Sequence, residues 1–198
     1  SFVEQDDVFN ALEPVLYELF NENNNHNKLT SWKVHKNPFP RIPYIECLNK
    51  YGTDKPDLRN PLIIEDFTKV FLNSNFKIFS DRILKGSMVK GIVVKNTADK
   101  PRSFFDKLNE WAKGEGAAGL GYINFLNREF KGPIANNLLN EQLEKLNLKN
   151  NDSIFFICDH LKNAQLFAGK VREKLAHDLN LLDEESFQFC WVIDFPMY

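Results

Sequence analysis

The stretch Ser153-Ile-Phe-Phe-Ile-Cys158 is a continuous apolar run that follows a polar turn at residues 150–152. Such a run is typical of a strand in the middle of a sheet, where both faces are covered by other elements. Side chains alternate between the two faces of a strand, so we expect Phe155 and Phe156 to be buried on opposite sides. The run therefore predicts an interior strand with a neighbouring strand on each side.

The next stretch of the chain has the longest helical stripe, with apolar residues three and four positions apart. This spacing predicts an amphipathic helix, for which Asp159 or Asn163 would be the cap. The helix is also locally basic. Such cations usually form a solvated face, and the alternative is that they face an RNA backbone. The candidate RNA-facing residues are Lys162, Lys170, Arg172 and Lys174.

The remaining elements are read from the same two periodicities. Helices are expected at residues 8–20, where Pro14 interrupts the pattern, at 42–48, at 101–114 and from Pro133 onward. Strands are expected at 76–79, at 88–95 with Gly91 as a bulge, and at 119–125. The Asn-rich residues 21–27 are interpreted as a helix end and surface loop. Strands mixed with helices predict an α+β fold, with an antiparallel sheet and helices on one face in two layers.

A charged turn, here called the elbow, follows residue 51 in the segment Tyr51-Gly-Thr-Asp-Lys-Pro-Asp-Leu-Arg-Asn-Pro61. Gly52 permits a sharp turn, and Pro56 and Pro61 exclude a regular helix or a central strand. The simplest interpretation is a solvated loop whose opposite charges pair with one another. The alternative is contact with a substrate. The candidate residues are Asp54, Lys55, Asp57 and Arg59.

The composition is that of a globular protein, with 43% hydrophobic residues and 18 Phe in 198 residues. The net charge of −2 argues against a strongly basic nucleic-acid clamp. No apolar run approaches a membrane span, so no membrane partner is expected. The three cysteines form no CxxC pair, which favours a reduced, intracellular setting. The four histidines lack metal-ligand spacing. The chain has no initiating Met and stops within a strand, so we expect an excised fragment.

The glycine-containing stretch Lys113-Gly-Glu-Gly-Ala-Ala-Gly119 is a weak candidate for a phosphate-binding loop. It lacks the GK[ST] ending of such loops, and it precedes a strand instead of opening a helix. A helix end followed by a turn explains it without a ligand. We therefore expect no bound cofactor here.

Two segments near the ends of the chain resemble a known family. The elbow sequence YGTDKPDLRNP resembles the segment after motif 2 in bacterial-type aspartyl-tRNA synthetases, and WVIDFPMY (residues 191–198) resembles the strand that re-enters their catalytic domain. Between them, KGEGAAGLGYI and DSIFFICD are similar to the insertion domain of these enzymes, often called the GAD domain. The resemblance implies a catalytic-domain segment at 1–61, an insertion domain at 62–184 and a return strand at 185–198. An inserted domain leaves and re-enters its host at adjacent points, so the two ends should meet.

The resemblance also implies a function for the parent protein. Class II aspartyl-tRNA synthetases are cytoplasmic ligases that activate aspartate with ATP and Mg²⁺ and transfer it to the 3′ end of tRNA. Their phosphate-binding arginines, the motif 1 homodimer interface and the anticodon-reading domain correspond to segments outside this chain. The resemblance thus implies no catalytic residue here, no cofactor bound by the fragment and no activity of the fragment alone. The insertion would be structural or tRNA-assisting.

An alternative is the GAD-domain module of a tRNA-dependent amidotransferase subunit, although the two flanking segments favour the synthetase. The sequence leaves open whether the parent charges only the tRNA for aspartate or also the tRNA for asparagine.

Overall fold

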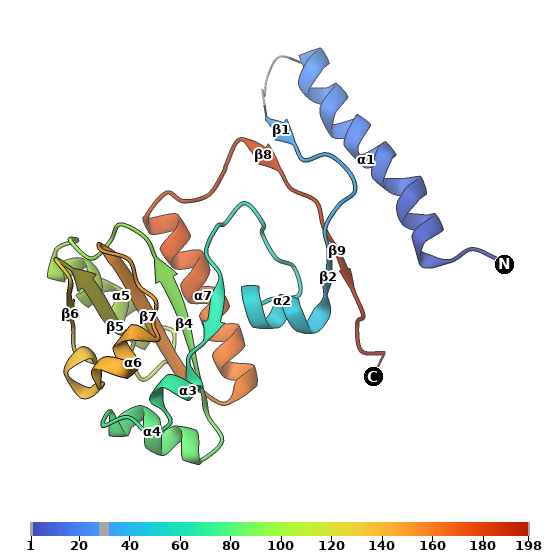
Figure 1. The fold of residues 1–198 in the computed structure, drawn as a ribbon. Coiled ribbons are helices and arrows are strands. Elements are labelled where there is room, and N and C mark those ends of the chain that lie inside the picture. The colour runs from blue at the N-terminus through green and yellow to red at the C-terminus, as the bar shows by residue number, and fades with distance from the viewer. Residues whose placement is uncertain (1, 28–31, 198) are drawn as a thin grey trace.

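The computed structural model describes residues 2–27 and 32–197, with side chains except those of residues 22–27. Its centre is a five-stranded sheet in which all neighbouring strands are antiparallel (Figure 1). The order is β3 (Ile64–Asp66), β4 (Met88–Val94), β7 (Asp152–Asp159), β5 (Gly121–Leu126) and β6 (Glu129–Lys131). The apolar run forms β7, with β4 on one side and β5 on the other. The predicted interior strand is therefore confirmed.

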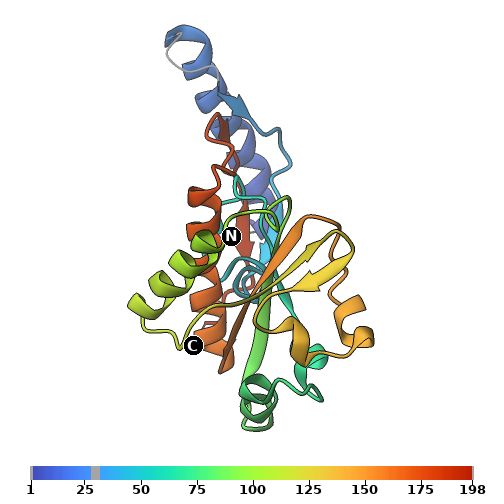
Figure 2. The same cartoon turned by 90° about the vertical axis from the view of Figure 1, so that its left-hand side faces the viewer.

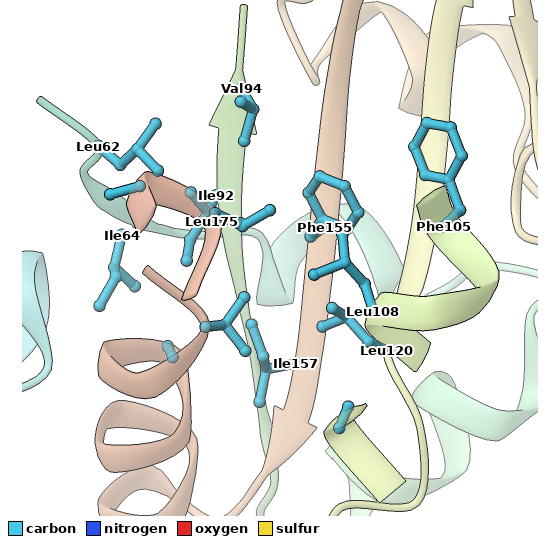
Figure 3. Close-up of a cluster of buried hydrophobic side chains, with 14 of the residues drawn as sticks. Leu62, Ile64, Ile92, Val94, Phe105, Leu108, Leu120, Phe155, Ile157 and Leu175 are labelled. Carbon is cyan, nitrogen blue, oxygen red and sulfur yellow. The ribbon is translucent and has the colours of Figure 1, made fainter. Parts of the chain in front are cut away.

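Both faces of β7 are covered because both are apolar. Phe155 and Ile157 pack against α5 (Arg102–Gly114) and α7 (Leu161–Asp178), as Figure 3 shows for Phe155, Phe105 and Leu175. On the opposite face, Phe156 belongs to a second core. Phe155 and Phe156 are each 1% exposed. That second core is covered by short helices: α3 (Thr68–Phe71), α4 (Lys77–Leu84), the 3-10 helix η1 (Ala135–Asn137) and α6 (Asn140–Glu144).

The predicted α+β fold and antiparallel sheet are confirmed, but the placement of helices on one face only is wrong. Figure 2 shows the long helices α5 and α7 on one side of the sheet and the short helix α6 on the other. The physical reason lies in β7, whose second face carries Ile154 and Phe156 and requires a cover of its own. The three- and five-residue lengths of η1 and α6 gave little periodicity for the sequence to reveal.

Three local predictions also need correction. Residues 76–79 begin helix α4 and form no strand, since Phe76 and Phe79 pack edge to face with Phe71 on one helical side. Gly91 is no bulge, because it pairs in regular register with Glu65 and Phe156. A side chain there would meet the ring of Phe67 at 2.6 Å, so a glycine is needed for close packing.

Helix boundaries differ from the sequence expectations in two places. The helix expected from Pro133 is interrupted at Leu138, whose extended backbone separates η1 from α6. The N-cap of α7 is His160 and neither Asp159 nor Asn163, and Asp159 instead accepts a hydrogen bond from the His160 backbone N–H. In contrast, α5 begins after Pro101 and ends at Gly114 as predicted.

The first helix, α1 (Gln5–Asn27), is longer than expected. It continues through Pro14 and through the Asn-rich residues that were predicted to be a loop. Extending an established helix costs less than starting one, so a polar stretch of weak propensity can remain helical. Glu13 is 4% exposed, and its carboxylate accepts hydrogen bonds from the Trp191 indole and the Phe39 backbone N–H.

The two ends of the chain lie side by side (Figure 1). β1 (Lys33–Val34) pairs in parallel with β8 (Ser186–Phe187), and β2 (Arg41–Pro43) pairs in parallel with β9 (Trp191–Ile193). The ring of Phe9 on α1 lies 4.5 Å from that of Trp191. The expected meeting of the ends is therefore observed, while the boundaries at residues 61 and 184 remain a prediction.

Candidate functional site: the elbow and its contacts with helix α7

The elbow begins where α2 (Tyr44–Tyr51) ends and leads into β3. Gly52 adopts φ +73 and donates its N–H to the Leu48 carbonyl, which closes the helix. This left-handed backbone is the sharp turn that the sequence predicts, and it favours glycine because no Cβ obstructs it. Figure 1 shows α7 between α2 and the sheet, so the elbow leaves α2 beside α7.

Two of the four elbow candidates form a pair. The Arg59 Nε donates to Asp57 Oδ1 at 2.9 Å, and Nη2 donates to Oδ2 at 2.8 Å. The hydrogen bonds from Arg59 hold the pKa of Asp57 below its ordinary value, and those to Asp57 raise the pKa of Arg59. Within the described residues, Asp54 and Lys55 form no ion pair. The Asp57–Arg59 pair therefore stiffens the loop, and the Lys55 side chain is exposed.

Arg172 belongs to the elbow, which corrects its prediction as an RNA-facing residue. It is 1% exposed. Its Nε donates to the Leu62 carbonyl at 2.6 Å, and its Nη2 donates to the carbonyls of Asp57 and Asn60 at 2.9 and 2.7 Å. Its guanidinium also lies 5.1 Å from the ring centroid of Tyr51. Arg172 thus connects α7 to three backbone carbonyls at and just after the elbow.

The connection is reciprocal and well satisfied. The Asn60 side-chain amide donates to the Arg172 carbonyl at 3.2 Å, and its oxygen accepts from the Leu62 N–H at 3.0 Å. Burial lowers the pKa of Arg172, although the nearby Tyr51 and Asp57 raise it. Hydrogen bonds from a charged donor are among the stronger ones in proteins, which compensates the removal of this charge from water.

Two glycines allow α2 and α7 to approach one another closely. A Cβ on Gly169 would lie 2.8 Å from the Gly52 carbonyl oxygen, and a Cβ on Gly52 would lie 2.5 Å from the Gln165 carbonyl oxygen. The Gln165 side chain donates to Asn49 Oδ1 at 2.9 Å. We call this contact between residues 49–62 and residues 165–172 the junction.

The other three cations of α7 lie outside the junction. Lys162 is exposed, Lys170 pairs with Glu115 at 2.8 Å, and Lys174 pairs with Asp178 at 2.7 Å. The sequence contained a signal that separates Arg172 from them. Arg172 follows Ala168 by four positions and precedes Leu175 by three, which places it on the buried side of the helix. An RNA-facing role for the three lysines remains a prediction.

A hollow of about 1010 Å³ lies elsewhere, beside the end of β7 and the loop from α5 to β5. Its rim contains the glycine loop, in which Gly116 and Gly119 have positive φ and the Asn109 side chain accepts the Leu120 N–H. The loop is a helix end and turn, as predicted. Charged side chains at the rim pair with acidic neighbours: Arg82 with Asp159, Arg102 with Asp106, and Glu115 with Lys170.

The described residues contain no cluster of three or more His, Cys, Asp or Glu side chains suited to a metal ion. Among the helices described, none is long and apolar enough to cross a membrane. Cys47, Cys158 and Cys190 are unpaired thiols. Burial raises the pKa of all three, and that of Cys47 to about 11.

The family can now be stated, because the whole chain, including the junction, matches one profile. The chain belongs to the class II tRNA synthetases (D, K and N), whose family profile matches residues 1–198. Over 203 aligned residues it is 51% identical to proteins named aspartate–tRNA(Asp/Asn) ligase from Rickettsia bellii (strain OSU 85-389) and Rickettsia prowazekii (strain Madrid E). The equivalent protein of Rickettsia felis is 50% identical. Each alignment covers 100% of this chain and 33% of the relative, so the chain spans about a third of their length.

Proposed function

We propose that the chain is part of an aspartate–tRNA ligase, which activates aspartate with ATP and transfers the aspartyl group to the 3′ end of tRNA. The supporting observation is the 49–51% identity to ligases over the full chain, elbow and ends included. The amidotransferase alternative is less well supported, because the residues outside the insertion also match ligases. The relatives' names include both tRNA species, so charging of the tRNA for asparagine belongs to the same proposal.

The three-part division of the chain is proposed on the basis of its contacts. Every strand of the five-stranded sheet lies between residues 62 and 184, while β1, β2, β8 and β9 pair outside that range. We assign residues 1–61 and 185–198 to the catalytic domain and residues 62–184 to the GAD-type insertion. The outer side of α1 exposes Val8, Leu12 and Val15, which suits packing against further catalytic-domain segments.

The proposed reaction requires charge stabilisation that the described residues do not provide. ATP would be a substrate, and Mg²⁺ would neutralise phosphate charge. The described residues offer no cluster of metal-ligating side chains, and Arg172 and Arg59 are already bonded within the junction. We therefore assign ATP, the metal and the homodimer contacts to other segments of a cytoplasmic parent enzyme, and derive no catalytic step here.

The part of this chain in the proposed function is structural. The elbow carries the chain from the catalytic segment into the insertion, and the junction determines its course. The exposed side chain of Lys55 is then available to the catalytic segments, and Lys162, Lys170 and Lys174 to tRNA. Both of these contacts are part of the proposal.

An ATP–pyrophosphate exchange assay tests the proposal. The full-length protein should catalyse exchange that depends on aspartate, and it should charge the tRNA for aspartate. The 198-residue chain alone should catalyse neither reaction, because the residues that meet the phosphates lie elsewhere. Full-length protein with glutamate or asparagine in place of aspartate is the matched control. A full-length protein without aspartate-dependent exchange would overturn the proposal.

A further inference from the structure

The junction joins two parts of the chain that are far apart in sequence. Arg172, at position 172, contacts carbonyls at positions 57, 60 and 62, and Gly169 contacts Gly52. A second tie lies beyond α7, where the Asp183 backbone N–H donates to the Arg59 carbonyl at 3.2 Å. The elbow is therefore bonded both to α7 and to the segment that leaves it.

This arrangement restricts motion between the insertion and the catalytic segment. A domain connected by two peptide segments can swing on them unless side contacts prevent it. Here α7 packs on the sheet with one side and on α2 with another. Rotation of the insertion about the elbow would break three hydrogen bonds of a buried guanidinium, which are costly to leave unmade.

We propose that Arg172 is a positioning residue that sets the orientation of the insertion relative to the catalytic segment, and that this orientation serves the tRNA-dependent step of the ligase. The inference rests on the proposed function. Arg172 is buried and contacts no substrate; it acts through the elbow backbone. Adenylate formation involves small substrates held within the catalytic domain. Transfer requires a large tRNA to be aligned across the enzyme, so it is the step sensitive to domain orientation.

The test compares two activities of the same full-length protein. Aspartate-dependent ATP–pyrophosphate exchange reports adenylate formation, and charging at limiting tRNA reports transfer. A substitution that merely lowers the folded fraction reduces both activities by the same factor, so their ratio does not change. A substitution that misorients the insertion reduces charging more than exchange. The ratio of the two activities is therefore the quantity to measure.

Three variants perturb the junction by different means. Arg172→Met removes all the guanidinium hydrogen bonds, and Arg172→Lys keeps a cation but loses the planar fork. Gly169→Ala leaves Arg172 in place and puts a methyl group against the Gly52 carbonyl. We expect the ratio of charging to exchange to fall on the order of tenfold in Arg172→Met and to fall less in Arg172→Lys and Gly169→Ala.

Arg102→Met is the matched control, since Arg102 is an exposed helical arginine that pairs only with Asp106, its neighbour one turn away. Its ratio should stay within about twofold of wild type. If Arg172→Met does not fold, Arg172→Lys and Gly169→Ala decide the question. Unchanged ratios in those variants, with an active wild type, would overturn the inference. A wild type without exchange would instead overturn the proposed function.

Discussion

One helix, α7, presents two faces with opposite fates. Arg172 and Lys174 are two positions apart and carry the same charge, yet Arg172 is 1% exposed and the Lys174 side chain is 33% exposed. Arg172 donates to three backbone carbonyls, whereas Lys174 pairs with Asp178 one turn further on. A cation on a helix can therefore serve the fold or the surface, and the face on which it lies decides which.

The largest expected effect is on stability when the buried cation is removed. Arg172→Met should lower the free energy of unfolding by about 3 kcal/mol or more, since each unsatisfied buried carbonyl costs about 1–3 kcal/mol. Lys174→Met should cost less than about 1 kcal/mol, because an exposed ion pair contributes little. Urea denaturation of both variants measures the difference. Equal losses would remove the distinction between the two faces.

The glycine contact should give an intermediate effect. Gly169→Ala should destabilise the protein by about 1–3 kcal/mol, because the added methyl group would overlap the Gly52 carbonyl. Gly114→Ala is the matched control, since nothing lies within 4 Å of its Cβ position and its φ is not positive. That control should be neutral or stabilise the protein by about 0.4–1 kcal/mol. A neutral Gly169→Ala would show that α2 and α7 are less closely packed than described.

The elbow should matter more for activity than the solvated face of α7. In the full-length enzyme, Lys55→Ala or Arg59→Ala should lower the charging rate about threefold or more, which corresponds to about 0.7 kcal/mol. Lys162→Ala and Lys174→Ala should have smaller effects. Initial rates of tRNA charging for the four variants provide the comparison. Elbow variants at the wild-type rate would return these residues to the simpler interpretation of a solvated loop.

The smallest expected effect concerns pH and the Asp57–Arg59 pair. The pKa of Asp57 is lowered in the folded state, so its stabilising effect is present above the unfolded pKa of about 3.9 and is lost as pH falls through the folded value. The Asp57 side chain is 37% exposed, so the pair should contribute less than about 1 kcal/mol.

Denaturation of wild type and Asp57→Asn at several pH values measures this contribution. The stability difference between them should be present near about pH 6 and should shrink below about pH 4. Asp99→Asn, in an exposed turn, controls for the change in net charge. A difference that persists unchanged at the acidic end would show that the carboxylate charge of Asp57 is not involved.

Much of the sheet domain could be predicted because its pattern is long and consistent. The apolar run at β7, the branched residues of β4 and the stripe of α7 each identify an element by periodicity. The errors occurred where the pattern was short. Four residues starting at Phe76 fit a strand or a helix equally well, and only packing with Phe71 decides between them.

The candidate site was predicted only in part. The sharp turn at Gly52 and the charge pair at Asp57 and Arg59 follow from residue types that are close in sequence. Arg172 could not be assigned to the elbow, because its partners are 110 to 115 positions away. Its place on the buried side of α7 was visible from spacing, but what covers that side was not.

The sequence by itself therefore determined the α+β class, the interior strand, the long basic helix and the family. Each of these depends on local periodicity or on a contiguous motif. The tertiary structure alone decided which cation is buried, why Gly91 and Gly169 lack side chains, and how the elbow is held against α7. Those features depend on contacts between segments distant in sequence, and such contacts exist only once the chain has folded.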